Sequence, residues 1–131
     1  MAAANKEFPW MSYYGNYNFF VRKLRVHDKV NGVETIDAKN GVYKIHLSDS
    51  SINVFICECY SFGMAEYYEL LGKIDVEIDV EIDAIVINSN WCSYSSDVKE
   101  QCKELRVGVF KFGEFLGAIN RRDFWNYISP D

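Results

Sequence analysis

Short apolar runs bounded by turn residues mark the second half of the chain. Ala84 to Ile87 is entirely apolar, and Arg106 to Phe110 contains a second short apolar run. Such runs are typical of strands buried on both faces of a parallel sheet. Between the two runs, Ser95-Ser96-Asp97 has the composition of a helix N-cap and predicts a helix over 98–105. A further helix is predicted over 113–119, and an aromatic-rich stretch at 123–128 closes the chain.

The middle of the chain predicts a β-hairpin. Val42 to Leu47 and Ile52 to Tyr60 have the composition of strands, and Asp49-Ser50-Ser51 provides a tight connection between them. Helices are predicted over 64–71 and, near the start, from about 13 to 26. The resulting order α-β-β-α-β-α-β-α predicts a single α/β domain. We expect a mixed sheet with an N-terminal hairpin and buried parallel strands, flanked by helices, with an aromatic segment at 1–20 and a core at 42–120.

An acidic repeat precedes the buried strand at Ala84. Residues 75–83 contain Asp-Val-Glu-Ile twice and end in a further Asp. Their alternation favours a strand, but apolar residues also recur at every fourth position through residues 70–82, which favours a helix. A strand from 75 to 88 would be about 45 Å long, too long for a domain of this size. We therefore expect a helix or a bent segment before Ala84, with the acids forming a solvated face.

Composition and charge narrow the function classes. The chain has 131 residues, 49% of them apolar, and a formal net charge of −5. This length allows one sizeable core, and the negative charge disfavours general attraction to nucleic-acid backbones. No apolar run is long enough to span a bilayer, and the first residues lack the core of a signal peptide. We expect no membrane association and an intracellular or virion location. The four cysteines have no Cys-x-x-Cys spacing, so buried free thiols are favoured over a metal site.

The segment 42–119 resembles the restriction-endonuclease-like fold, and most closely its Mrr and Holliday-junction-resolvase branch. The resemblance rests on the hairpin ending in Glu58, the helix 64–72, the strand 83–87, the helix 97–105, and the strand 107–110 leading into the helix 114–119. It implies a magnesium-dependent nuclease site. In that family, one carboxylate from each hairpin strand binds the metal, and a lysine beside the second carboxylate orients the attacking water.

The catalytic motif of that family is incomplete in this chain. Glu58 matches the second carboxylate, but Tyr60 occupies the lysine position and supplies no positive charge at neutral pH. A two-residue turn at Ser50-Ser51 would pair Glu58 with Tyr43, and a four-residue loop would place Gly41 there instead. In the first register Asp49 lies about 20 Å from Glu58 along the ladder, too far to share a metal ion. A rearranged site of Glu58, Glu69 and Lys73 is the remaining route to catalysis.

Two further groups are candidate binding residues. Seven aromatic residues occur between positions 8 and 20, and we expect the following to serve as core and as a protein interface: Trp10, Tyr13, Tyr14 and Tyr17. Basic residues follow this segment and are candidates for nucleic-acid contact: Arg22, Lys23, Arg25 and Lys29. Arg121 and Arg122 form a second basic pair.

These observations predict a non-catalytic structural or interaction protein with a degenerate nuclease fold. We expect its partner to be a second copy of itself or another protein, with no cofactor and no metal. The short, Tyr-rich chain is similar in style to small proteins of archaeal viruses, which suggests an assembly or virion component. The alternative is a nucleic-acid-binding protein or a metal-dependent nuclease with a rearranged site.

Overall fold

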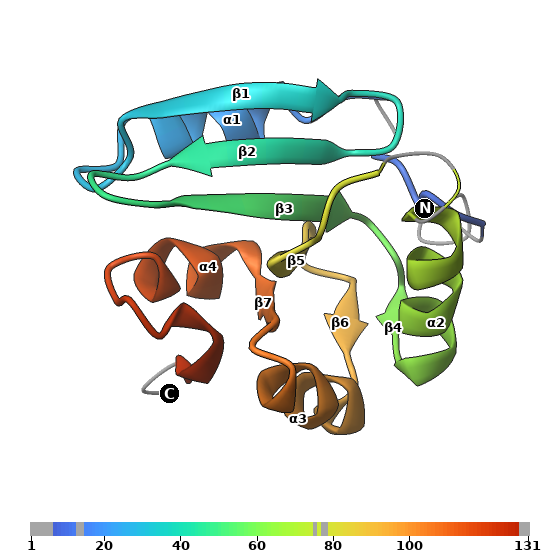
Figure 1. Cartoon of the computed structure of the whole chain (residues 1–131). Helices are drawn as coiled ribbons and strands as arrows, with labels where there is room; N and C mark the ends of the chain where they lie inside the picture. The colour runs from blue at the N-terminus through green and yellow to red at the C-terminus, as the bar shows by residue number, and fades with distance from the viewer. Residues whose placement is uncertain (1–6, 13–14, 75, 77–78, 129–131) are drawn as a thin grey trace.

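Five strands pair into one mixed sheet, and helices cover both of its faces (Figure 1). The structure, a computed structural model, describes residues 7–12, 15–74, 76 and 79–128. The strands of the sheet lie in the order β1-β2-β3-β5-β7. In chain order the elements are α1 (Asn18–Arg25), β1 (Gly32–Asp37), β2 (Val42–His46), β3 (Ser51–Cys57), β4 (Ser61–Phe62), α2 (Met64–Lys73), β5 (Ala84–Ile87), β6 (Ser93–Tyr94), α3 (Ser96–Glu104), β7 (Gly108–Lys111), α4 (Phe112–Ala118) and the 3₁₀ helix η3 (Phe124–Asn126).

Strand β3 is the point at which the sheet changes direction. It pairs antiparallel with β2 on one side and parallel with β5 on the other, and β5 pairs parallel with β7. All four residues of β5 are buried, and so are the last four of β3. This arrangement confirms the predicted α/β class, the hairpin and the buried parallel strands. Strands that are covered on both faces are apolar at every position, which is why β5 is a continuous apolar run in the sequence.

The two faces of the sheet carry different helices. Val54 and Ile56 of β3 point into a cluster that includes Phe20 of α1 and Phe115 of α4. Phe55 and Cys57 point to the other face, into a cluster with residues of α2 and α3. Helices α2 and α3 are the crossovers of β3-α2-β5 and β5-α3-β7, and crossovers of one hand that progress in one direction lie on one face.

In the first forty residues, one prediction was wrong and one strand was missed. The first helix begins at Asn18, not near residue 13, because Gly15 has a φ of 71° and the Asn16 side-chain oxygen accepts a hydrogen bond from the Asn18 amide (3.2 Å). Strand β1 was not predicted. As an edge strand it is only half buried and has no alternating pattern of buried and exposed residues, which removes the signal that identifies a strand.

The register of the β2–β3 hairpin also differs from both predicted registers. Val42 pairs with Phe55, and the Leu47 amide donates to the Ser50 carbonyl (2.8 Å), so Ser48 and Asp49 form the turn. The turn lies two residues earlier than the Ser50-Ser51 prediction. Such an even shift leaves every side chain on its predicted face, since the strand period is two. Neither Tyr43 nor Gly41 therefore lies opposite Glu58.

The prediction of a bent segment before Ala84 holds for the part that the structure describes. Residues 75, 77 and 78 of the acidic repeat lie outside the described residues. From Asp79 to Asp83 the chain has no helix or strand, and Asp79 has a φ of 56°. Ile82 is buried, and the Asp83 carboxylate accepts a hydrogen bond from the Asn53 amide (2.9 Å). These two contacts fix the segment against the sheet at the start of β5.

Gly41 provides a test of the close approach between β2 and β3. Its φ is 71°, and a Cβ atom there would lie 2.5 Å from the carbonyl oxygen of Ile56. Gly15 has the same φ, but nothing lies within 4 Å of its Cβ position. We expect Gly15→Ala to lower the free energy of unfolding by about 1 kcal/mol through backbone strain alone, and Gly41→Ala by at least about 2 kcal/mol because the clash is added.

Urea unfolding monitored by tryptophan fluorescence measures both values. Equal losses for the two variants would show that the Gly41–Ile56 contact is not as tight as the structure indicates.

Candidate functional site

The carboxyl ends of the three parallel strands, β3, β5 and β7, meet at one edge of the sheet. Cys57 of β3 pairs with Ile87 of β5, which pairs with Lys111 of β7. The residues that follow the first two strands are Glu58 and Asn88, and their side chains meet there. In open α/β sheets, ligand sites form outside the carboxyl ends of the parallel strands. This edge is therefore the candidate functional site.

Glu58 is held firmly at this edge. Its side chain is 7% exposed, and its Oε2 accepts a hydrogen bond of 2.9 Å from the Asn88 side-chain amide. Its backbone amide donates to the Trp10 carbonyl (2.7 Å), and the Asn88 amide donates to the Cys57 carbonyl (2.8 Å). Buried carboxylates are costly unless hydrogen-bonded, so Asn88 compensates for the burial of Glu58.

Glu58 lines a cleft of about 480 Å³ at this edge. Its lining residues come from α1, from the residue after β3, from the end of β5 and the segment that follows it, and from the β7–α4 junction: Phe19, Glu58, Ile87, Asn88, Ser89, Asn90, Trp91, Lys111, Phe112 and Gly113. Within this lining, Glu58 is the one acidic residue and Lys111 the one basic residue. The exposed rings of Phe19 and Trp91 add apolar surface. The cleft can therefore hold a mixed polar and aromatic partner, with one charge of each sign.

A strained backbone lies beside Glu58. Ser89 has a φ of 98°, and its buried hydroxyl makes no hydrogen bond of standard geometry within the described residues. Its neighbour Cys92 is buried, and burial raises the pKa of that thiol, with a smaller contribution from the nearby Glu58 carboxylate. A buried thiol with a raised pKa is a poor nucleophile at neutral pH.

The described residues do not assemble a metal centre. They contain no group of three or more His, Cys, Asp or Glu side chains that could hold a metal ion. Magnesium in nuclease sites is held by two or more carboxylates that also position substrate and water. One carboxylate hydrogen-bonded to an amide does not provide this arrangement.

Two acids near the ends of β2 are engaged elsewhere, Asp37 at the end of β1 and Asp49 in the β2–β3 turn. The Asp37 carboxylate accepts hydrogen bonds from the Asn40 amide (3.2 Å) and the Asn40 side chain (2.9 Å). Asp49 lies at the hairpin turn and pairs with Arg122 (2.9 Å). The observed register places Asp49 at the opposite end of β3 from Glu58. Asp49 and Glu58 are therefore too far apart to share a metal ion, as predicted, although both predicted registers were wrong.

The rearranged site of Glu58, Glu69 and Lys73 is contradicted by the layers of the fold. Glu58 lines a cleft on the side of α1 and α4. Glu69 and Lys73 are exposed residues of α2, and α2 packs on the opposite face of the sheet. The sheet therefore separates the two groups. The error arose because sequence spacing alone does not indicate which face a crossover helix covers.

Two of the four aromatic residues predicted to serve as core and as a protein interface lie in the core. Trp10 and Tyr17 are both 3% exposed. Trp10 packs edge-on against Phe55 and Phe62, with ring centroids 6.3 and 6.0 Å away, and the Tyr17 hydroxyl donates to the Trp10 carbonyl (3.3 Å). They complete the core where the N-terminal segment crosses the end of β3. Tyr13 and Tyr14 lie outside the described residues.

The predicted basic residues lie on α1 and in the segment that follows it. Arg22, Lys23 and Arg25 are exposed on α1, and Lys23 lies over the Phe19 ring at 5.4 Å. Lys29 lines a different cleft of about 310 Å³ together with Arg121 and Arg122. The predicted nucleic-acid residues therefore lie on α1 and, for Lys29, at the rim of this second cleft.

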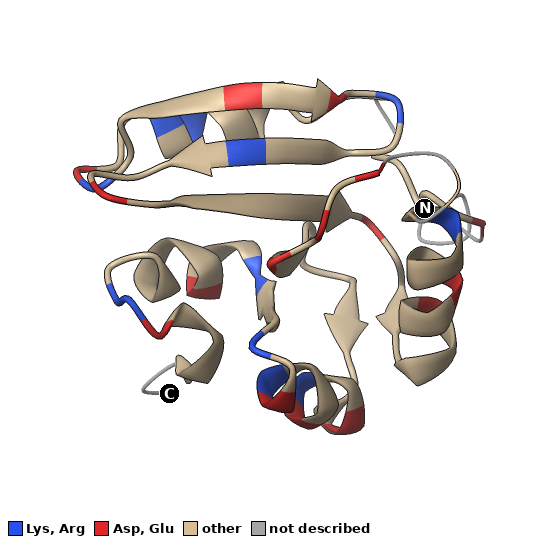
Figure 2. Cartoon of the chain, viewed as in Figure 1, with Lys and Arg blue, Asp and Glu red and all other residues tan. Residues whose placement is uncertain are grey.

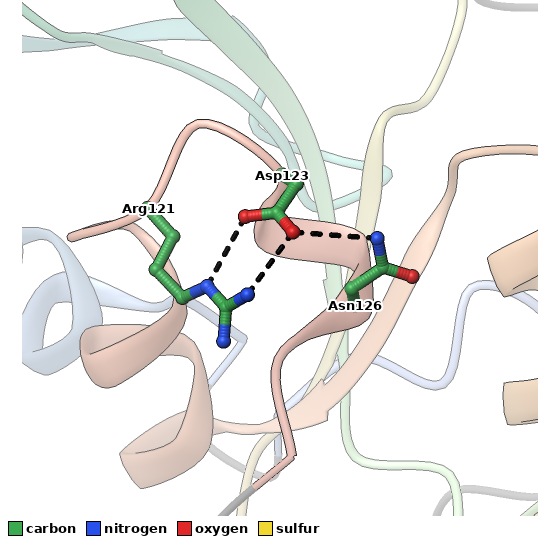
Figure 3. Close-up of polar contacts among 3 residues, drawn as sticks. All are labelled: Arg121, Asp123 and Asn126. Atoms are coloured by element: carbon green, nitrogen blue, oxygen red, sulfur yellow. Dashed lines mark hydrogen bonds and ion pairs between the residues drawn. The ribbon is translucent and has the colours of Figure 1, made fainter.

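Arg121 and Arg122 already have acidic partners. Arg121 binds both oxygens of Asp123 at 3.1 and 3.0 Å, and Asn126 donates to the same carboxylate at 3.4 Å (Figure 3). These hydrogen bonds lower the pKa of Asp123, chiefly through Arg121. Arg122 pairs with Asp49 across the second cleft. Such pairing reduces the positive charge available to a phosphate.

Sequence reasoning missed three residues of the Glu58 cleft. Asn88 and Lys111 stand at the ends of strands that were predicted as buried and parallel, and Trp91 follows shortly after β5. The rule that sites form at carboxyl ends could have identified them from the predicted strands. That rule does not predict that Cys57, Ile87 and Lys111 pair with one another across the sheet, because this pairing depends on the register of the parallel strands.

Comparison with protein-family models, with curated proteins and with solved structures found no match for this chain. Among the described residues, no helix has both the length and the apolar character needed to cross a membrane.

The predicted buried thiols are present and give a chemical test. All four cysteines are free and buried. Burial raises the pKa of Cys59 and of Cys102 to about 11, and it also raises the pKa of Cys57 and of Cys92. Because the thiolate is the reactive form, we expect Ellman's reagent at pH 8 to modify the native protein at least about 100-fold more slowly than the same protein in 6 M guanidinium.

The absorbance of the released thiolate measures both rates. A native cysteine that reacts as fast as in guanidinium would contradict the buried assignment, and peptide mapping would identify it.

Proposed function

We propose that this chain is a non-catalytic interaction protein built on a degenerate restriction-endonuclease-like fold. The mixed sheet with an antiparallel β1–β2–β3 unit followed by parallel β5 and β7 supports this family, as does the placement of α2 and α3 as crossovers. The family remains a proposal that rests on element order and on the position of Glu58 at the end of β3.

The observation that carries the non-catalytic part of the proposal is the state of Glu58. It is the one acidic side chain in the lining of its cleft, and Asn88 already binds it. Tyr60, which stands where the family has lysine, is largely exposed and lies beyond the end of β3. A hydrogen-bonded carboxylate without a second acid is suited to holding the cleft together and unsuited to activating water.

Exposed apolar residues support the interaction part of the proposal. Large apolar side chains are exposed on α1, on α2 and at the end of α3: Phe19, Val26, Tyr68, Leu71 and Leu105. Single exposed apolar residues are ordinary, but groups of them beside clefts are typical of protein-binding surfaces. A role in assembly, including assembly of a virus particle, follows as the proposed biological setting.

A cleavage assay separates this proposal from a nuclease. We expect no cleavage of branched, single-stranded or duplex DNA with Mg²⁺ or Mn²⁺, because a metal site would need acids that the cleft lining lacks. Gel electrophoresis of end-labelled DNA measures the result. Glu58→Ala and Lys111→Ala serve as matched controls, since they remove the two charges of the cleft.

Metal-dependent cleavage that Glu58→Ala abolishes would overturn the proposal and support a rearranged nuclease. Salt-sensitive DNA binding that Lys111→Ala weakens, without cleavage, would instead favour a nucleic-acid-binding role.

A further inference from the structure

An apolar groove with an acidic rim lies between the ends of α2 and α3. It has a volume of about 510 Å³ and is lined by Tyr67, Leu71, Ile74, Asp79, Val80, Glu81, Ile82, Leu105 and Val107. Three of these form a buried floor: Tyr67, Ile74 and Ile82. Leu71 and Leu105 are exposed walls, and Asp79 and Glu81 are exposed acids. The groove can therefore accept an apolar surface that also carries positive charge.

The outer face of α1 has the complementary pattern. Phe19 and Val26 are 57% and 78% exposed, while Arg22 and Lys23 lie exposed between them. These positions are spaced i, i+3, i+4 and i+7, so they form one stripe along the helix. The inner face of the same helix buries Phe20 and Leu24 in the core. Within the described residues, neither Arg22 nor Lys23 forms an ion pair with an acid.

The two surfaces cannot meet within one molecule. Helix α1 packs on one face of the sheet, with Phe115 of α4, whereas the groove residues Tyr67 and Ile82 pack on the other face. Figure 2 shows the basic positions of α1 behind the β1–β2 hairpin and acidic positions along the segment that leads into β5. The stripe and the groove are therefore free to bind two different neighbours.

We propose that the α1 stripe of one copy docks in the α2–α3 groove of the next copy. This inference rests on the proposed interaction function and names its partner. A second copy is the occupant that charge complementarity supports, because the basic, amphipathic helix that fits the groove is present on the chain itself. The contact belongs to the helix-in-groove mode, in which residues at i, i+3, i+4 and i+7 anchor a helix.

The geometry determines the type of assembly. Stripe and groove are different surfaces, so the contact is heterologous, and a pair of bound copies leaves one stripe and one groove unoccupied. Repetition of the contact builds a ring or an open filament. An eight-residue helix is about 12 Å long. Its contact therefore buries less surface than a standard interface, which buries about 800 Å² on each partner. We therefore expect a dissociation constant on the order of micromolar, weakened by salt because charges contribute.

Two variants test the proposal, each of which blocks one of the two surfaces; they are called capping variants here because each would end a growing assembly. Val26→Asp places an acid in the stripe, and Leu105→Asp places one in the acidic groove; both positions are exposed, so the fold is retained. Light scattering of the wild-type chain is expected to show a mass that rises with concentration above the 15.2 kDa monomer. Each variant alone is expected to stay monomeric. An equimolar mixture retains one intact stripe and one intact groove per pair, so it is expected to stop at a heterodimer.

The charges have their own matched test. Arg22→Glu is expected to weaken wild-type association at least about tenfold, because it brings a negative charge to the acidic groove. Lys39→Glu makes the same change in net charge at an exposed position of the β1–β2 turn, and Ile128→Asp makes the same type of change as Val26→Asp outside both surfaces. Both controls are expected to associate like the wild type.

Several results would overturn the proposal. They are a wild-type chain that stays monomeric into the millimolar range, capping variants that associate like the wild type, and a mixture that grows beyond the heterodimer. If the capping variants associate as strongly as the wild type, the stripe–groove contact is excluded, but the proposed interaction function is not. DNA cleavage that depends on Glu58 would contradict the proposed function, whatever the oligomeric state of the protein.

Discussion

The pairing of β3 is the interaction on which the rest of the structure depends. This strand is antiparallel to β2 and parallel to β5, and its last four residues are buried. A strand in that position needs helices on both faces, and the chain supplies α1 and α4 on one face and α2 and α3 on the other. The two crossovers then deliver β5 and β7 in parallel, which brings the ends of three strands to one edge. The Glu58 cleft, the α1 stripe and the α2–α3 groove are all positioned by this arrangement.

The same arrangement limits what Glu58 can do. Because side chains alternate across a strand, Glu58 points to the face covered by α1 and α4. Glu69 and Lys73 of α2 lie on the opposite face of the sheet. Asn88, the residue that follows the neighbouring strand, is close enough to donate a hydrogen bond of 2.9 Å to the carboxylate. A second acid beside Glu58 would suit this position to metal binding, but the Glu58 carboxylate is instead hydrogen-bonded to Asn88. The exposed apolar surfaces lie elsewhere on the molecule.

Much of the fold was predictable because local signals agreed with it. The four-residue apolar run of β5 was predicted with its observed bounds, and Ser95 accepts a hydrogen bond from the Val98 amide as an N-cap residue should (3.1 Å). The edge strand β1 was missed because half burial leaves no pattern. The hairpin register was missed because β3 is apolar on both faces, so the hydrophobic pattern does not choose among registers that differ by an even number of residues.

The sequence by itself determined the class of the fold, the buried parallel strands, the free thiols and the absence of a lysine two residues after Glu58. Only the tertiary structure decided which residues share a site. It buried Trp10 and Tyr17 in the core and placed Lys111 beside the cleft of Glu58. It also set the basic stripe of α1 and the acidic groove on opposite faces of the sheet. The physical reason is that composition and periodicity act over a few neighbouring residues, whereas these contacts join segments that are distant along the chain and depend on register and on the face each helix covers.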